Sequence, residues 1–564
     1  MNSAVTAPTF RELFTPKLIS TLRDGYRLSD LASDAMAGLT VAVVALPLSM
    51  AIAIACGVSP ERGLYTAIIG GFLVSALGGS RFQIGGPAGA FIVMVAATVE
   101  HFGVSGLLVA TFLCGVILLL AGLLRLGTFI KYIPYPVTVA FTGGIALIIL
   151  ASQLKDLLGL NLAKEPGPII PKLAAITEAL PTVNAYALTT AVIAIIIIIV
   201  VRRGRPHWPS YLIAVVVAAT LTSLAHWPIE TIGTRFGGIG RTLPTPHLPD
   251  LSAASVLPLL PSALSFALLG GIESLLSAVV ADSMTGRRHR SNCELVAQGL
   301  ANIASSLFGG ICVTGTIART ATNVRAGARS PLAGMSHSLY LLLFILIAEP
   351  LAQYIPLAAL AGVLTVVCWN MVEKTEFATL LRASRSDAAV LLCTFGLVVF
   401  RDLATGIVVG FVLSALLFIH RLAQTIEIQG VPLVADTDRA DAPGRGARTV
   451  YEREHLSHPE IVVYKVTGAF FFGAAAAVGA ALDRIGERPR AFVIDLSAVP
   501  FMDSSGAATV GAFCRKAQKR GAHVAIVAAE PIQQTLRAHG LDQPGVEFFA
   551  TVEQAMKATE SRLA

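Results

Sequence analysis

A short apolar stretch of the chain carries residues that a continuous lipid-facing helix rarely holds. Residues 309–320 contain the glycines Gly309, Gly310 and Gly315, followed closely by Arg319. An arginine inside a hydrophobic layer is costly unless it faces a cavity, a partner or a ligand. Arg319 therefore either attracts an anionic ligand or ties down backbone carbonyl groups.

A second stretch, earlier in the chain, aligns with the first. When Gly78-Gly79 is superposed on Gly309-Gly310, the run Pro87-Ala88-Gly89 falls on Ala318-Arg319-Thr320. Two Gly/Pro-interrupted membrane segments at corresponding places in two halves indicate the central site of a transporter. Half-helices that begin in mid-membrane present unpaired N–H groups and positive dipole ends. The predicted ligand is therefore an anion.

A carboxyl group lies in another apolar run. Glu273 is followed by no other ionisable residue until Asp282, and Ser277 lies one turn further on the same helix face. Glu273 could carry a proton, share a cation with Ser277, or act as an internal counter-ion for Arg319. An ionisable residue is more costly at membrane depth than on a surface, so a role of this kind is expected for Glu273.

The composition is that of a polytopic membrane protein. Of the 564 residues, 54% are hydrophobic and 14% charged, and the mean hydropathy is +0.72, far outside the range of soluble domains. The net charge of +7 is interpreted as loop charge that sets orientation, not as nucleic-acid binding. The cysteines are scattered, and no metal cluster, cofactor motif or catalytic nucleophile stands out, so we expect no enzyme.

Apolar runs of about 20 residues, with shorter ones where a helix is broken, predict fourteen spans within a transmembrane domain at residues 34–421. An odd number of spans in each half requires the second half to be inverted, which builds a midplane site from two half-helices. The predicted spans are 36–56, 61–78, 84–99, 104–124, 134–153, 184–201 and 208–226, then 259–281, 291–309, 313–325, 332–349, 356–372, 386–401 and 403–420.

Charge in the loops predicts the orientation. If the N-terminal segment, residues 1–33, is inside, every predicted inside loop is basic, for example at Arg81, at Arg125 and at Arg287-Arg288. Cytoplasmic loops collect Lys and Arg. We therefore expect a multi-pass protein of the cell inner (plasma) membrane with both termini in the cytoplasm.

The last part of the chain is soluble in composition. A polar linker at residues 422–456 precedes a domain at 457–564, in which predicted strands and helices alternate. This pattern is typical of a small α/β domain with a mainly parallel sheet.

Several motifs together resemble the SulP family of anion permeases, over nearly the whole chain. They are Pro47-Leu48-Ser49-Met50-Ala51, Gly57-Val58-Ser59-Pro60-Glu61-Arg62-Gly63, Gly85-Gly86-Pro87-Ala88-Gly89-Ala90-Phe91 and Thr316-Ile317-Ala318-Arg319-Thr320-Ala321-Thr322-Asn323. The resemblance implies fourteen helices in two inverted repeats of seven, split into a core domain that carries substrate and a gate domain. It also implies an elevator-like movement of core against gate, and a homodimer.

The resemblance also implies positions for the substrate. It would bind between the starts of the third and tenth helices, and two residues of the first helix would close the pocket. Some members have glutamine at the position of Leu48 and serine at that of Ala318, so backbone N–H groups would be the main ligands here. The implied substrate-binding residues are Leu48, Ile52, Gly89, Ala90, Phe91, Ile317, Ala318 and Arg319.

The family resemblance also implies which ion is coupled to transport. Sodium-coupled bicarbonate carriers of the family resemble this span but have aspartate at position 273 and threonine at position 277. Glutamate is more typical of members thought to be proton-coupled, which favours proton symport through Glu273. Sodium coupling through Glu273 and Ser277 is the alternative.

The C-terminal domain resembles a STAS domain, with the marker Asp495-Leu496-Ser497 leading to Asp503-Ser504-Ser505-Gly506. In related anti-sigma-factor antagonists the serine corresponding to Ser504 is phosphorylated, and a phosphate is favourably placed at a helix N-terminus. The alternative is that these residues only cap the helix.

The sequence thus predicts a secondary active transporter of a small anion, namely sulfate, bicarbonate or a C4-dicarboxylate, with a proton as the coupling ion. The competing hypotheses are a sodium-coupled bicarbonate symporter, a passive anion channel or exchanger regulated by the STAS domain, and a signalling receptor. The expected partners are the lipid bilayer, a second copy of the chain and a cytoplasmic protein at the STAS domain.

Overall fold

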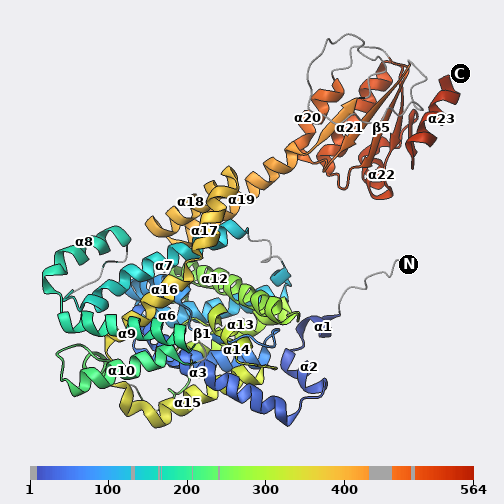
Figure 1. The fold of residues 1–564 in the computed structure, drawn as a ribbon. Helices are drawn as coiled ribbons and strands as arrows, with labels where there is room; N and C mark the ends of the chain where they lie inside the picture. The colour runs from blue at the N-terminus through green and yellow to red at the C-terminus, as the bar shows by residue number, and fades with distance from the viewer. Residues whose placement is uncertain are drawn as a thin grey trace. The chain divides into compact units, whose positions relative to one another are not determined.

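The computed structural model describes residues 9–128, 134–162, 166, 168–205, 208–238, 240, 242–430, 460–483 and 489–563. The chain forms two compact units that divide between Phe411 and Val412 (Figure 1). Most of the predicted linker at 422–456 lies outside the described residues.

The first unit is helical. Its principal helices are α3 (Leu28–Ala55), α4 (Pro60–Tyr65), α5 (Gly71–Leu77), α6 (Ile92–Leu123), α7 (Tyr135–Leu158), α9 (Ala185–Gly204), α10 (Ser210–Leu224), α12 (Ala253–Thr285), α13 (Ser291–Leu307), α14 (Ile317–Arg325), α15 (Leu332–Ala352), α16 (Leu357–Met371), α18 (Arg385–Phe400) and α19 (Leu403–Gln424), the last of which continues into the second unit. Shorter helices are α1 (Phe10–Phe14), α2 (Lys17–Arg23), α8 (Ile169–Ala179), α11 (Ile232–Phe236) and α17 (Lys374–Ala383).

Each of the fourteen predicted spans overlaps helical structure, as the amount of apolar sequence requires. Among the described residues, seven helices are long and apolar enough to cross a membrane by length and composition. The predicted spans 84–99 and 104–124 form one element, α6, which is interrupted at Gly103 with φ of 67°. A left-handed residue breaks the regular helix there, and glycine adopts that conformation without steric cost.

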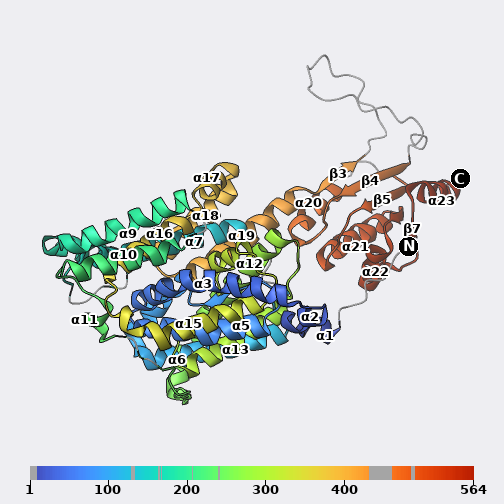
Figure 2. The ribbon, with the colours of Figure 1, turned by 60° about the horizontal axis from the view of Figure 1, so that its bottom comes forward.

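The helices form two bundles (Figure 2). The core bundle consists of α3 to α6 and α12 to α15, in which α6 packs against α12 and α13, and α3 against α15. The gate bundle consists of α7, α9, α10, α16 and α18, in which α7 packs against α16 and α18. Helix α3 also contacts α10 and α16, so it lies at the boundary between the bundles.

Glycines let the core helices approach closely. A Cβ atom added at Gly115 of α6 would lie 2.6 Å from the carbonyl oxygen of Gly299 in α13, and one added at Gly299 would lie 2.7 Å from the Gly115 carbonyl. Small residues at such crossings allow close packing where no hydrophobic driving force joins the helices in lipid.

The second unit is an α/β domain. Its five-stranded sheet has the order β3-β4-β5-β6-β7, and its strands are parallel except for the antiparallel pair of β3 and β4. The strands are β3 (Glu427–Gly430), β4 (Ile461–Thr467), β5 (Ala491–Ala498), β6 (His523–Val527) and β7 (Val546–Phe549), and the helices are α20 (Phe472–Asp483), α21 (Ser504–Lys519), α22 (Glu530–Leu536) and α23 (Val552–Leu563).

The predicted fold class, a mainly parallel sheet that alternates with helices, is confirmed for this unit. One strand was not foreseen. Strand β3 falls within residues 422–456, which the sequence predicted to be linker, and pairs Glu427 with Thr467. A four-residue strand that includes glycine carries too little alternating hydrophobicity to be recognised before its partner strand is known.

The crossing of α6 and α13 gives a stability prediction. Gly115→Ala places a methyl group against the Gly299 carbonyl, so we expect a loss of about 1–3 kcal/mol, as is typical of overpacking. Thermal unfolding of the protein purified in detergent should show an apparent melting temperature lowered by several degrees. Gly396→Ala in α18 is the control, because nothing lies within 4 Å of a Cβ added there. Equal melting of the two variants would contradict the prediction.

Candidate functional site

The two interrupted segments from opposite halves of the transmembrane unit meet. Strand β1 (Gly85–Gly86) pairs antiparallel with β2 (Thr314–Gly315), and the Thr316 N–H donates to the Ile84 carbonyl at 3.0 Å. A 3₁₀ turn at Gly89–Phe91 follows the first segment and leads into α6, and α14 follows the second. Two helix starts are therefore joined by a short backbone bridge.

Side chains from neighbouring helices satisfy the unwound backbone. Asn302 of α13 accepts the Val313 N–H at 2.9 Å and donates to the Val313 carbonyl at 2.8 Å. Thr66, in the π-helical turn between α4 and α5, accepts the Ile311 N–H at 2.7 Å. In a membrane, non-helical backbone persists only where the protein or a water-filled cavity provides such partners.

A charged side chain in each half of the transmembrane unit also binds a loop of the other half. Glu294 of α13 accepts the N–H groups of Gly79 and Ser80 at 2.8 and 3.1 Å. In the opposite direction, Arg62 of α4 donates to the Gly309 carbonyl at 2.6 Å. The two loops that precede the helix starts are thus fixed by charged side chains from the other repeat.

The Arg319 side chain lies next to the backbone bridge of β1 and β2, beside Gly86. Its side chain is only 2% exposed, and its Nη2 donates to Ser49 Oγ and to the Pro87 carbonyl, both at 3.2 Å. A Cβ atom added at Gly86 would lie 2.2 Å from Nη1, so only glycine leaves room for the guanidinium. Among the described residues, Nε and Nη1 have no hydrogen-bond partner. Arg319 therefore fixes a backbone carbonyl and retains donors without acceptors.

Glu273 is within electrostatic range of Arg319. The described residues show no ion pair between them, and Glu273 Oε2 is buried without a hydrogen-bond partner. The residue as a whole is half-buried. Ser277, which the sequence placed on the same helix face, donates to Thr320 Oγ1 at 2.9 Å. The serine hydroxyl is thus engaged with α14, and the carboxyl group remains available to a proton or a cation.

A histidine missed in the sequence also belongs to this region. His337 of α15 is fully buried, neither ring nitrogen has a partner among the described residues, and it lies within electrostatic range of Arg319. An ionisable residue inside the predicted span 332–349 was the available signal. Its neighbourhood depends on the packing of α15 against α3, which the sequence did not reveal.

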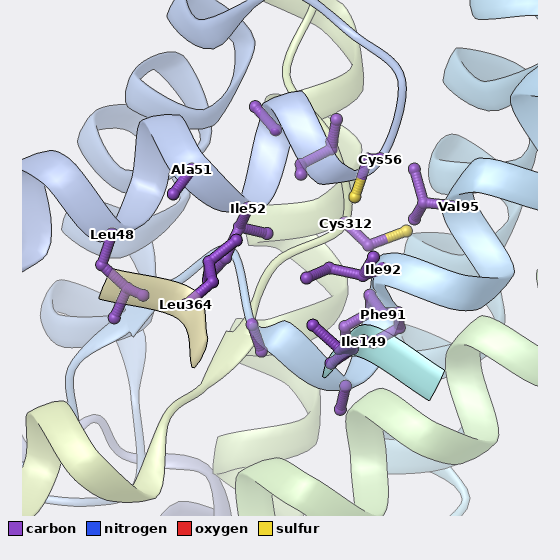
Figure 3. Close-up of a cluster of buried hydrophobic side chains, with 14 of the residues drawn as sticks. Leu48, Ala51, Ile52, Cys56, Phe91, Ile92, Val95, Ile149, Cys312 and Leu364 are labelled. Carbon is purple, nitrogen blue, oxygen red and sulfur yellow. The ribbon is translucent and has the colours of Figure 1, made fainter. Parts of the chain in front are cut away.

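Four of the other predicted substrate residues, Leu48, Ile52, Ala90 and Phe91, lie in an apolar cluster between the bundles. Figure 3 shows Leu48, Ile52 and Phe91 of the core bundle clustered with Ile149 and Leu364 of the gate bundle. Ala90 is also buried there. Of the apolar positions, Gly89 and Ile317 are half-buried and Ala318 is exposed.

One face of α14 can be reached from outside the protein. Ala318, Thr322 and Arg325 follow one another at helical spacing, and they are exposed, half-buried and exposed respectively. Thr322 Oγ1 donates to the Ala318 carbonyl at 2.8 Å. This polar face is better suited to water than to lipid, and it leads to the start of α14.

In the second unit, Ser504 is exposed at the first position of α21. The helix cap is Asp503, whose carboxylate accepts the N–H groups of Gly506 at 2.8 Å and Phe472 at 3.0 Å. Capping is therefore performed by Asp503, and the Ser504 side chain is accessible at the positive end of the helix dipole.

Comparison with known proteins places these features in a family. The sulfate permease family matches residues 31–394, and the STAS domain matches residues 453–555. The putative sulfate transporter YvdB of Bacillus subtilis (strain 168) is 39% identical over 509 residues, which cover 89% of this chain and 92% of that protein. The bicarbonate transporter BicA of Picosynechococcus sp. is 30% identical over 493 residues, or 84% of each chain.

A solved structure has a similar fold. Murine Slc26a9, described as an anion transporter in the inward-facing state, superposes with a TM-score of 0.85 at 20% sequence identity, covering 100% of this chain and 96% of that chain. The fold therefore defines a helical membrane protein with a C-terminal STAS domain. The chain belongs to the sulfate permease family, which confirms the SulP resemblance of its motifs.

The two hydrogen bonds between the Asn302 side chain and the Val313 backbone, called here the Val313 clamp, give a prediction for the site. Asn302→Leu removes two hydrogen bonds from buried backbone groups and should cost about 1–3 kcal/mol for each group left unsatisfied. We expect a lower apparent melting temperature and weaker anion binding, measured on the purified protein. Asn370→Leu is the control, because Asn370 donates to the carbonyl of Val366 one turn back in its own helix. Wild-type stability and affinity in Asn302→Leu would show that the clamp is unimportant.

Proposed function

We propose that the protein is a secondary active transporter that moves a small anion across the inner (plasma) membrane together with a proton. The observation that carries the proposal is the meeting of two broken helices at β1 and β2, beside Arg319, whose Nε and Nη1 have no hydrogen-bond partner among the described residues. The curated relatives named above, a putative sulfate transporter and a bicarbonate transporter, support an oxyanion. Sulfate, bicarbonate and C4-dicarboxylates are the candidate substrates.

The anion binds between the 3₁₀ turn at Gly89–Phe91 and the start of α14. The first N–H groups of a helix have no partner within the helix, and the helix dipole favours negative charge there. Leu48 and Ala318 offer no polar side chain, so backbone N–H groups are the main ligands. Arg319 contributes positive charge next to the bridge. Its Nη2 binds the Pro87 carbonyl, so this oxygen is not left unpaired near the anion.

Glu273 carries the coupled proton. Its buried Oε2 has no hydrogen-bond partner in the described structure, so the carboxyl group is available to a proton. Sodium coupling through Glu273 and Ser277 is the alternative, since the Ser277 oxygen keeps its lone pairs while the hydroxyl donates to Thr320. The charge of Arg319 would interact with both Glu273 and the bound anion, so release of the proton and release of the anion can be linked.

Transport proceeds by movement of the core bundle against the gate bundle. The contact of Ile52 and Phe91 with Leu364 and Ile149 is apolar, so sliding breaks no hydrogen bond between these side chains. The exposed face of α14 provides the route to the cytoplasm, on the side where both termini lie. Alternation between this route and an outer one completes the cycle.

The STAS domain regulates transport or helps two chains to form a homodimer. The accessible Ser504 hydroxyl at the start of α21 supports phosphorylation as one means of regulation, since added negative charge is stabilised at that helix end. The alternative is that Ser504 has only a structural role beside the Asp503 cap.

Glu273→Gln tests the coupling. Wild-type protein in liposomes should accumulate sulfate, bicarbonate, fumarate or succinate against its gradient, and a protonophore should abolish the accumulation. The glutamine variant should lose proton-driven accumulation and retain anion exchange, because the amide cannot cycle a proton. Glu376→Gln in the exposed helix α17 is the control. Unchanged accumulation would remove Glu273 from the mechanism, and wild-type flux that follows only the anion gradient would indicate a channel.

Arg319→Ala tests the anion site. Loss of a charge-assisted interaction should weaken anion affinity about tenfold to a hundredfold, measured by the concentration dependence of thermal shift or uptake. Arg319→Gln separates charge from structure, since an amide can still donate to the Pro87 carbonyl. Arg382→Ala, on exposed α17, is the control. If affinity is retained in both Arg319 variants, the arginine has a structural role only.

A further inference from the structure

The two short helices that precede α3 lie at one end of the helical unit. Helix α1 packs against α13, and α2 packs against α5 (Figure 2). The Lys17 N–H donates to the Gly78 carbonyl at 2.9 Å, and Arg290 Nη1 donates to the Thr15 carbonyl. Gly78 directly follows α5, and Arg290 directly precedes α13. Residues 15–17 are therefore fixed at the level of the membrane surface that the predicted spans define.

Both helices expose apolar side chains. In α2, Ile19 is 41% and Leu22 51% exposed, whereas Thr21 of the same helix is buried. Phe10 of α1 is 61% exposed. Apolar side chains that point away from the protein at the membrane surface are typical of interfacial helices, which insert them between the head groups and the acyl chains of lipids. These exposed side chains therefore indicate contact with lipid.

Cationic side chains gather next to these helices. Burial lowers the pKa of Lys17, and the positive charge of three nearby arginines lowers it further, while Asp282 acts in the opposite direction. Lys17 and these arginines, called here the basic cluster, are Lys17, Arg81, Arg287 and Arg290. Like charges that act on one another in this way raise the electrostatic free energy of the surface, and a bound anion would lower it.

The acidic side chains near the basic cluster are engaged. Four of them accept hydrogen bonds, namely Glu12 from Thr9, Asp24 from Arg81, Asp282 from His289, and Glu294 from Gly79 and Ser80. Among the residues that the structure describes, the members of the basic cluster other than Arg81 form no ion pair. The chain segments of this region hold eight Lys or Arg and five Asp or Glu, counted over residues 9–31, 77–82 and 282–296. The surface is therefore positive overall.

We propose that the basic cluster and the exposed apolar side chains of α1 and α2 form a binding surface for anionic phospholipids of the leaflet that borders them. The cations bind the phosphate groups, and Phe10, Ile19 and Leu22 insert beside the acyl chains. A soluble anion would gain nothing from these apolar side chains, so the combination favours a lipid. This surface is separate from the proposed substrate site, and the inference does not require transport.

Bound lipid should stabilise the core bundle, because the loop after α5 belongs to the same surface. Lys17 binds the Gly78 carbonyl, and Glu294 binds the N–H groups of the next two residues. This loop leads to β1 and the backbone bridge. A ligand that binds only the folded protein raises its apparent stability, so lipid binding can be followed by thermal unfolding.

Lipid titration tests the proposal on the full-length protein purified in a neutral detergent. Phosphatidylglycerol should raise the apparent melting temperature by several degrees, and phosphatidylcholine at the same concentration should raise it much less. Lys17→Gln/Arg287→Gln should need about tenfold more phosphatidylglycerol for the same shift, because two charges of the basic cluster are lost. Lys519→Gln/Arg520→Gln, which removes two exposed charges from the second unit, is the matched control and should behave as the wild type.

Ile19→Ser/Leu22→Ser tests the apolar part of the surface with all charges retained. It should weaken phosphatidylglycerol binding severalfold, and added sodium chloride should weaken the remaining binding further by screening the charges. Arg287→Gln alone, at an exposed position, replaces the charge-removing double variant if that protein does not fold, and should weaken binding about fivefold.

Three results would overturn the lipid surface. The first is an equal effect of phosphatidylglycerol and phosphatidylcholine, or unchanged affinity in the folded variants. The second is equal stabilisation by glycerol phosphate, which would assign the surface to a soluble anion. The third is an altered oligomeric state of the variants with unchanged lipid affinity, which would assign it to a second copy of the chain. Because no transport is measured, these failures leave the proposed function untouched.

Discussion

The central constraint on this protein is that backbone polar groups cannot be left unpaired at membrane depth. Two segments give up helical hydrogen bonding, and the structure replaces it with a two-stranded bridge between Gly85–Gly86 and Thr314–Gly315. Asn302, Glu294 and Arg62 supply the remaining partners from other helices. Only after these groups are satisfied can two helix starts face each other, and the proposed anion site depends on that arrangement.

The position of Arg319 follows from the same bridge. The guanidinium occupies the space that a side chain at Gly86 would fill, and it is fixed by Ser49 and the Pro87 carbonyl. The charge of Arg319 acts on the two nearby helix starts. Glu273 and His337 lie within electrostatic range of Arg319. In the proposed site, an anion held mainly by backbone N–H groups and a nearby charge would be recognised by size and charge more than by side-chain chemistry.

The division into two bundles gives the site its access. The core bundle holds the bridge, Arg319 and Glu273, and the gate bundle contributes apolar side chains, such as Ile149 and Leu364, to the cluster between the bundles. The exposed face of α14 leads to the start of that helix. The proposed alternating access requires an apolar seal of this kind between the bundles.

Local pattern and length were enough to predict a helical membrane unit, the glycine-interrupted segments that meet in it and the α/β domain, because hydrophobic periodicity and backbone-breaking residues act within a few turns of chain. The motifs were also enough to identify the family. The hydrogen bonds from Asn302, Glu294 and Arg62, the surroundings of His337 and strand β3 were not predictable in this way. Arg62 and Gly309, for example, are 247 residues apart, and no local preference records which distant groups will meet. Their pairing is selected only when the helices pack, since burial then requires every exposed backbone group to find a partner.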